Sequence, residues 1–220
     1  MRVSARAEPA IGIVLEAMDR MGVLPFFTGI LCHDHWKPYF QYDCVHVLCN
    51  AHHLRELEWC IDFEKQVWAG TMKSLLVEIN SEKIKEGFIS SERQEAFQRR
   101  YRTILTQGER ECPITDKPSA KRGRTKKSKS RNLLERLQNF EQETLRFMRE
   151  VLVPFTNNQG ENDIRMTKVQ QKISGCFRSM QGAINFCRIR GFLSTCRKNH
   201  VNPTDALRML FEGKLPDFVK

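Results

Sequence analysis

Residues 28–39 read Thr28-Gly-Ile-Leu-Cys-His-Asp-His-Trp-Lys-Pro-Tyr39. The first six residues form a short apolar run that is typical of a buried β-strand, and Asp34 follows it directly. Pro38 then predicts a turn. A carboxylate at a strand end projects from the edge of a sheet, where α/β proteins place catalytic groups. The alternative is an Asp that only closes a turn through local hydrogen bonds.

Most of the remaining chain has the periodicity of helices. A second short strand is expected at residues 45–49, and helices are expected over residues 10–22, from residue 50, and over 64–106, 132–151, 159–173, 181–198 and 204–211. The predicted fold class is therefore α/β, and α-rich overall. We expect a strand-bearing core over 1–63, a helical insertion with a basic flexible arm over 64–131, C-terminal helices over 132–213 and a tail over 214–220.

The charge of the chain favours an acidic polymer as its partner. Its 220 residues carry a formal net charge of +10. An exposed basic arm is predicted to neutralise DNA phosphates without reading sequence, and its cations include Lys121, Arg122, Arg124, Lys126 and Lys127. Eight cysteines without a CxxC pair, no secretory signal and no run of membrane-spanning length predict a cytosolic protein with reduced thiols and no membrane partner.

A second carboxylate stands near the start of a predicted helix. Asn157 and Asn158 are favourable helix caps, and Glu161 falls in the first turn. One stripe of this helix carries Glu161 followed by Arg165, Lys168 and Lys172. Met166, Val169 and Ile173 fall together a quarter turn away, where they can pack on a core. The pattern suits a helix that holds a metal at one end and DNA phosphates along its length. The alternative is a glutamate that favours the helix dipole beside a solvated basic stripe.

The segment Cys49-Asn-Ala-His52 has the spacing of half a zinc site. No second half with matching spacing is evident, since the next cysteine, Cys60, has no paired histidine. We therefore expect Cys49 to be buried at the end of the second strand. His52 is then expected to pack or hydrogen-bond near the carboxylates.

Several segments together resemble, in order, those of the insertion-sequence-sixty-six family of bacterial transposases: residues 29–39 (GILCHDHWKPY), 46–57 (HVLCNAHHLREL), 154–165 (PFTNNQGENDIR), 168–178 (KVQQKISGCFR) and 190–198 (RGFLSTCRK). The resemblance implies a ribonuclease H-like fold with a DDE-type active site. In such a site three carboxylates hold two divalent metals, usually Mg²⁺ and otherwise Mn²⁺. One metal activates a water or a 3′-hydroxyl, and the other stabilises the leaving oxygen.

By this resemblance Asp34 is the second catalytic, metal-binding carboxylate and Glu161 is the third. Cys49 and His52 map close to the active site, and Arg178 joins Arg165, Lys168 and Lys172 among the DNA-binding residues. The implied activity is cleavage and transfer of DNA strands at transposon ends, in the cytoplasm on nucleoid DNA. Self-association and partner transposition proteins are compatible with it.

Two departures from the family pattern bear on activity. Position 35 is His where the family commonly has Gly, and Gly160-Glu-Asn162 replaces a common Ala-Glu-Arg. About thirty residues precede Asp34, and Asp19 among them lies in a helical pattern. We therefore expect an N-terminally truncated, partial ribonuclease H-like core that lacks the first carboxylate, binds metal weakly and is inactive alone. The alternative is a non-catalytic, basic DNA-binding remnant that acts as a regulator or retains no function.

Overall fold

The computed structural model describes residues 15–114 and 127–219. The chain divides into two compact units, Met1–Asn157 and Asn158–Lys220, which are described separately below. Helices dominate both units, so the expectation of an α-rich chain is confirmed. The finer division expected at residues 63, 131 and 213 stays a prediction.

The first unit contains a pair of parallel strands, β1 (Ile30–His33) and β2 (Val45–Leu48), close to where strands were expected. The pairing runs from Ile30 opposite Val45 to His33 opposite Leu48. Two short segments precede β1: a helical segment over residues 15–20 and the 3₁₀ helix η1 (Leu24–Phe26). The expected turn at Pro38 is the 3₁₀ helix η2 (Lys37–Gln41), where proline occupies a starting position that needs no N–H donor.

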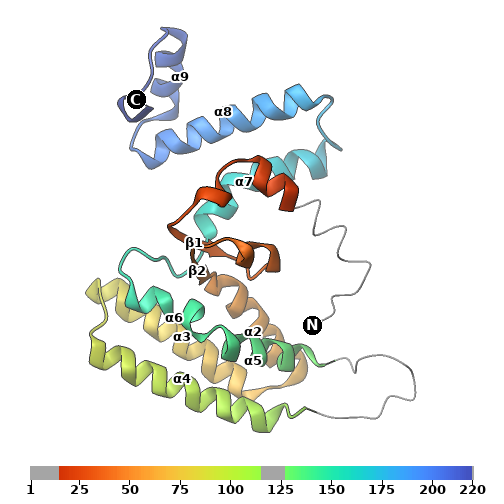
Figure 1. Cartoon of the computed structure of the whole chain (residues 1–220), viewed down its shortest axis with the longest axis vertical. Helices are drawn as coiled ribbons and strands as arrows, with labels where there is room; N and C mark the ends of the chain where they lie inside the picture. The colour runs from red at the N-terminus through yellow and green to blue at the C-terminus, as the bar shows by residue number, and fades with distance from the viewer. Residues whose placement is uncertain (1–14, 115–126, 220) are drawn as a thin grey trace. The chain divides into compact units, whose positions relative to one another are not determined.

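Five helices complete the first unit: α2 (Asn50–Glu64), α3 (Val67–Glu86), α4 (Ser91–Glu111), α5 (Lys129–Asn139) and α6 (Glu141–Arg149) (Figure 1). The helical region predicted over 64–106 is thus two helices, because Gly87 adopts φ 76° and ends α3. The helix predicted over 132–151 is also interrupted, at Phe140, where φ is −122°. In addition, α5 begins three residues before the expected start.

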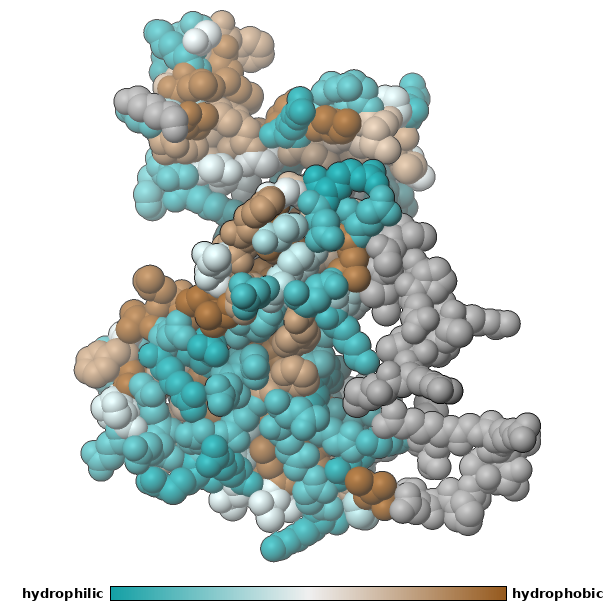
Figure 2. Space-filling view, in the orientation of Figure 1, coloured by the Kyte–Doolittle hydropathy of each residue, from teal (hydrophilic) through white to brown (hydrophobic). Residues whose placement is uncertain are grey.

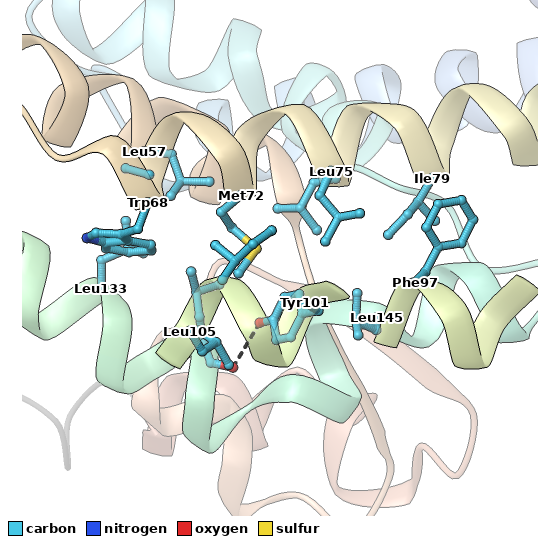
Figure 3. Packing of buried hydrophobic residues seen from close by; sticks show 14 of the residues in the cluster. Leu57, Trp68, Met72, Leu75, Ile79, Phe97, Tyr101, Leu105, Leu133 and Leu145 are labelled. Carbon is cyan, nitrogen blue, oxygen red and sulfur yellow. Dashed lines mark hydrogen bonds between the residues drawn. The ribbon is translucent and has the colours of Figure 1, made fainter. Parts of the chain in front are cut away.

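The hydrophobic core lies mainly between these helices. Trp68 of α3 lies beside Leu133 of α5 at one end of the cluster, and Ile79 of α3 lies beside Phe97 of α4 at the other, with Met72 and Tyr101 between them (Figure 3). The Tyr101 hydroxyl donates to the Leu137 carbonyl at 2.9 Å, which satisfies a fully buried polar group. The outer face of the α3–α4 layer is mainly hydrophilic in Figure 2. The region predicted as an insertion therefore supplies most of the core of this unit.

Two glutamates cap the starts of neighbouring helices across the fold. Glu111, the last residue of α4, accepts from the backbone N–H of Val67 at 2.7 Å and of Trp68 at 3.1 Å. Glu64, at the end of α2, accepts from the backbone N–H of Lys129 and Ser130 at 3.3 and 3.2 Å. The first N–H groups of a helix have no partner within the helix, and a carboxylate also complements the helix dipole. These contacts fix where α3 and α5 begin.

The second unit contains α7 (Asn158–Ile173), α8 (Met180–Lys198), α9 (Pro203–Phe211) and the 3₁₀ helix η3 (Asp217–Val219). The Asn202 side chain accepts from the Thr204 N–H at 2.9 Å, so the start expected for α9 is confirmed. Among the described residues of this unit only Cys196, Ala206 and Pro216 are buried.

The apolar face expected on α7 is therefore not a buried one. Met166 is 41% exposed and Ile173 is 79% exposed. The physical reason is size, because three helices and a short turn enclose few side chains. Across the described ranges of both units, no helix combines the length and the apolar character that a membrane span needs.

Candidate functional site

Asp34 follows β1 directly, is exposed, and lies at one edge of the parallel pair. Because the strands are parallel, their carboxyl ends meet at this edge, where Cys49 follows β2. The Cys49 N–H donates to the His33 carbonyl at 2.8 Å, which holds the two ends together. The Trp36 N–H donates to Asp34 Oδ1 at 3.2 Å, so Asp34 also closes a local turn. Asp34 therefore has both features that the sequence offered as alternatives, a position at the sheet edge and a hydrogen bond that closes a turn. The turn contact uses one of its two carboxylate oxygens.

A pair of histidines, of which His33 is buried and His46 half-buried, braces the chain on one side of Asp34. His46 Nε2 lies 3.2 Å from the Tyr42 carbonyl, which only accepts, so Nε2 carries the proton. His46 Nδ1 lies 3.2 Å from His33 Nε2, so the two rings are within hydrogen-bond distance. His33 is 2% exposed, and burial, with His46 beside it, lowers its pKa to about 4. His33 is therefore a neutral imidazole at pH 7.

His35, on the other side of Asp34, adopts a left-handed backbone with φ 67°. Its ring makes an edge contact with Phe140, with centroids 4.4 Å apart. Burial lowers its pKa to about 4, and the positive charge of Arg136 acts in the same direction. Both sequence neighbours of Asp34 are consequently uncharged at pH 7, and neither imidazole neutralises the carboxylate.

The start of α2 is anchored by a buried polar network. Asn50 Nδ2 donates to the Thr144 carbonyl at 3.1 Å, and Asn50 Oδ1 accepts from His53 Nδ1 at 3.1 Å. Cys49 is 1% exposed, as expected, and its Sγ accepts from the Asn157 N–H at 3.1 Å. The network fixes the helix turn that carries Cys49 and His52, and His52 is half-buried. Both residues thus belong to the same end of the first unit as Asp34.

Glu161 belongs to the second unit, in the first turn of α7, as the sequence predicted. It is half-buried, and Arg165, Lys168 and Lys172 are exposed along the helix. Arg178, in the turn after α7, is exposed as well. The basic stripe is thus available to solvent. An approach of Glu161 to Asp34 stays a prediction.

The basic run before α5 differs in part from the expected exposed arm. Lys121, Arg122, Arg124 and Lys126 lie outside the described residues. Lys127 pairs with Glu135 at 2.5 Å. Arg131 is 7% exposed and pairs with Glu135 and with Glu109. The end of the run is therefore folded against carboxylates, and the spacing of Arg131 and Glu135 by four residues was a signal for this pairing.

The chain was compared with known protein families, with curated proteins and with solved structures. The family described as Transposase IS66 family matches residues 5–185, which is most of the chain. The chain belongs to the IS66 transposase family. Membership of this family supports a transposase function in general, with DNA as the partner. No curated protein and no solved structure matches.

The left-handed backbone at position 35 bears on the departure expected there. Glycine, expected at this position from the resemblance, would adopt the positive φ without a steric cost, whereas the side chain of His35 is strained. Asn50 is a residue whose role sequence reasoning missed. The only signal was a polar residue at the junction of a strand and a helix, which does not identify a partner such as Thr144, 94 residues away.

Proposed function

We propose that this chain contributes two carboxylates, Asp34 and Glu161, to a DDE-type site that cleaves and transfers DNA strands at transposon ends. The observation that carries the proposal is an exposed Asp34 at the carboxyl end of a parallel strand, in a chain of the IS66 transposase family. Catalytic groups of α/β proteins lie at such strand ends. In this proposal β1, β2 and the helices that follow belong to a ribonuclease H-like core.

The residues fit a hard divalent cation such as Mg²⁺ or Mn²⁺, because carboxylate oxygens are the ligands that these ions prefer. Asp34 is exposed, one of its oxygens accepts from a backbone N–H, and the histidines on both sides are neutral at pH 7. When bound, the metals supply activation of a water or 3′-hydroxyl and stabilisation of the leaving oxygen. Cys49 and His52 are poor ligands for Mg²⁺, so we assign them to shaping this edge of the sheet.

The exposed cations of α7 position the DNA. Arg165, Lys168 and Lys172 recur at three- and four-residue spacings after Glu161, so they share one side of the helix. Contacts of this kind to phosphate oxygens fix the register of the DNA without reading its sequence. Their contribution to affinity falls as salt rises, since each neutralised phosphate releases counterions.

A two-carboxylate site predicts weak metal binding and no cleavage by this chain alone. Among the described residues, a carboxylate directly follows β1, and Cys49, not a carboxylate, follows β2. Asp19 lies in a helical segment, where its Oδ1 accepts from the Tyr42 hydroxyl at 2.8 Å. In this proposal Asp19 therefore has a structural role and is not the first carboxylate of the site.

Metal binding tests whether Asp34 and Glu161 act together. Mn²⁺ titration followed by electron paramagnetic resonance should detect one weak site that either Asp34→Asn or Glu161→Gln removes. The double variant should lose no more than each single one, because both carboxylates hold the same ion. Asp62→Asn, at an exposed position of α2, is the matched control and should keep the site. Independent losses that add up in the double variant would refute a shared site.

A second candidate is a non-catalytic DNA-binding regulator, which the net charge of +10 and the exposed cations of α7 also fit. The two candidates differ at the carboxylates. In a version of the chain that carries a complete active site, Glu161→Gln should abolish strand cleavage and leave DNA binding intact. If Glu161→Gln and Asp34→Asn change neither metal binding nor cleavage, the regulator is favoured.

A further inference from the structure

A pocket of about 130 Å³ lies between α7 and α8, entirely within the second unit. Its polar lining comes from Gln159, Asn162 and Asp163 of α7 and from Arg190, Ser194 and Arg197 of α8. The volume is well above the roughly 10–15 Å³ that one ordered water requires, so a larger polar group fits.

The charge of this pocket is positive. Asp163 is already engaged, since the Lys198 ammonium and the Ser194 hydroxyl both donate to it and lower the pKa of its carboxyl. Within the described ranges, no ion pair involves the side chain of Arg190 or Arg197. Lys198 therefore offsets Asp163, and two guanidinium groups remain without a compensating anion.

Arg190 also has an unused donor. Its Nε is buried and has no hydrogen-bond partner among the described residues. A buried donor without a partner is costly, and a native protein rarely leaves one unless a ligand or water satisfies it. The side-chain amide of Asn162 lines the same space and can add N–H donors, and the amide of Gln159, which already hydrogen-bonds Asp163, has a second N–H. The pocket thus combines cations and donors around a space for an oxyanion.

From this geometry we propose that the α7–α8 pocket binds one phosphodiester group of the DNA backbone. A guanidinium presents parallel N–H donors that match two phosphate oxygens, and this match is stronger than that of an ammonium. The inference rests on the proposed function only in taking DNA as the ligand of this chain. It does not depend on Asp34, Glu161 or a metal. It places a phosphate contact on α8, beside the basic stripe of α7.

The test measures binding of the full chain to a fluorescent DNA duplex by anisotropy at several salt concentrations. Arg190→Ala and Arg197→Ala should each weaken binding about tenfold, the size of one charge-assisted hydrogen bond. The double variant Arg190→Ala/Arg197→Ala should reduce the slope of log affinity against log salt by about 0.9, the value for one phosphate contact, and each single variant should reduce it by no more than that. Arg188→Ala is the matched control, because Arg188 is exposed on α8 and does not line the pocket.

Arg190→Lys separates charge from the shape of the guanidinium. It should keep the salt slope and still lose affinity, since the ammonium cannot make the paired contact. Circular dichroism checks that each variant folds. If Arg190→Ala does not fold, Arg197→Ala carries the test, because Arg197 is exposed.

Three results would overturn the proposal. Arg190→Ala and Arg197→Ala could match Arg188→Ala while the unaltered chain still binds DNA with a steep salt slope, which refutes the pocket alone. The unaltered chain could bind no DNA, which refutes the proposed function as well. Inorganic phosphate could bind the chain in an Arg190-dependent way without competing with the duplex, which identifies a site for free phosphate instead of DNA.

Discussion

Replacing Asn50 by alanine tests whether the buried polar network holds the start of α2 in place. Asn50 is fully buried, and its side chain joins the Thr144 carbonyl of α6 to His53 Nδ1 of α2. Its backbone N–H donates to the Phe155 carbonyl at 3.1 Å, a contact that alanine retains. The substitution therefore removes the side-chain hydrogen bonds and leaves the main chain able to adopt the same path.

The size of the effect follows from one lost bond, to the Thr144 carbonyl, and one stranded donor, the His53 Nδ1–H. Each hydrogen bond contributes about 1 kcal/mol net, and a buried donor without a partner costs about 1–3 kcal/mol. His53 is 1% exposed, so its Nδ1–H has no water to replace Asn50. We expect Asn50→Ala to lower the free energy of unfolding by about 2–4 kcal/mol, compared with the roughly 5–15 kcal/mol of a typical domain.

Urea unfolding followed by circular dichroism measures this change. The midpoint should fall and the slope m should stay constant, because the surface exposed on unfolding is unchanged. Asn139→Ala is the matched control, since Asn139 is an exposed residue of α5 and its replacement should stay within about 0.5 kcal/mol. A loss below 0.5 kcal/mol for Asn50→Ala would show that the network does not stabilise the fold.

Three further outcomes follow from buried or strained positions. Burial lowers the pKa of His53 to about 3, so below about pH 6.5 the unfolded chain binds a proton that the folded chain does not. The free energy of unfolding should therefore fall by about 1.4 kcal/mol per pH unit from this residue, and denaturation at pH 6 and pH 5 should show a shallower fall in His53→Gln. A Cβ at Gly108 would lie 2.6 Å from Leu134, whereas at Gly70 the nearest atom is 3.9 Å away. Thermal melts should show Gly108→Ala less stable than Gly70→Ala by about 1–3 kcal/mol, and equal values would refute the overpacking. At position 35, urea midpoints should show His35→Ala less stable than His35→Gly by about 1 kcal/mol, because both lose the ring but only alanine keeps the strain of φ 67°.

Local signals predicted the elements that carry the proposed carboxylates. The apolar run before Asp34 gave the position of β1, and the asparagines before Glu161 gave the start of α7. The start predicted for the last helix, at residue 204, lies one residue after the observed start of α9 at Pro203. These features depend on residues that are close in sequence, which is why the chain alone was sufficient to predict them.

Contacts between distant residues were not predictable in the same way. The last cations of the basic run looked exposed, but Arg131 is buried because Glu109, 22 residues earlier, reaches it from another helix. The left-handed conformation of His35 had no local signal in the residues around it.

The two glutamate caps have a consequence for engineering the stretch between α4 and α5. Glu111 attaches the end of α4 to the start of α3, and Glu64 attaches the start of α5 to the end of α2, so both borders of residues 115–126 are tethered at the same α2–α3 junction. When the two ends of a segment are already held together, extra residues between them destabilise the fold only slightly. The entropic cost of closing a flexible segment rises by only about 0.6 kcal/mol when its length doubles. A fluorescent reporter or affinity tag spliced into this stretch should therefore leave the helical layer intact.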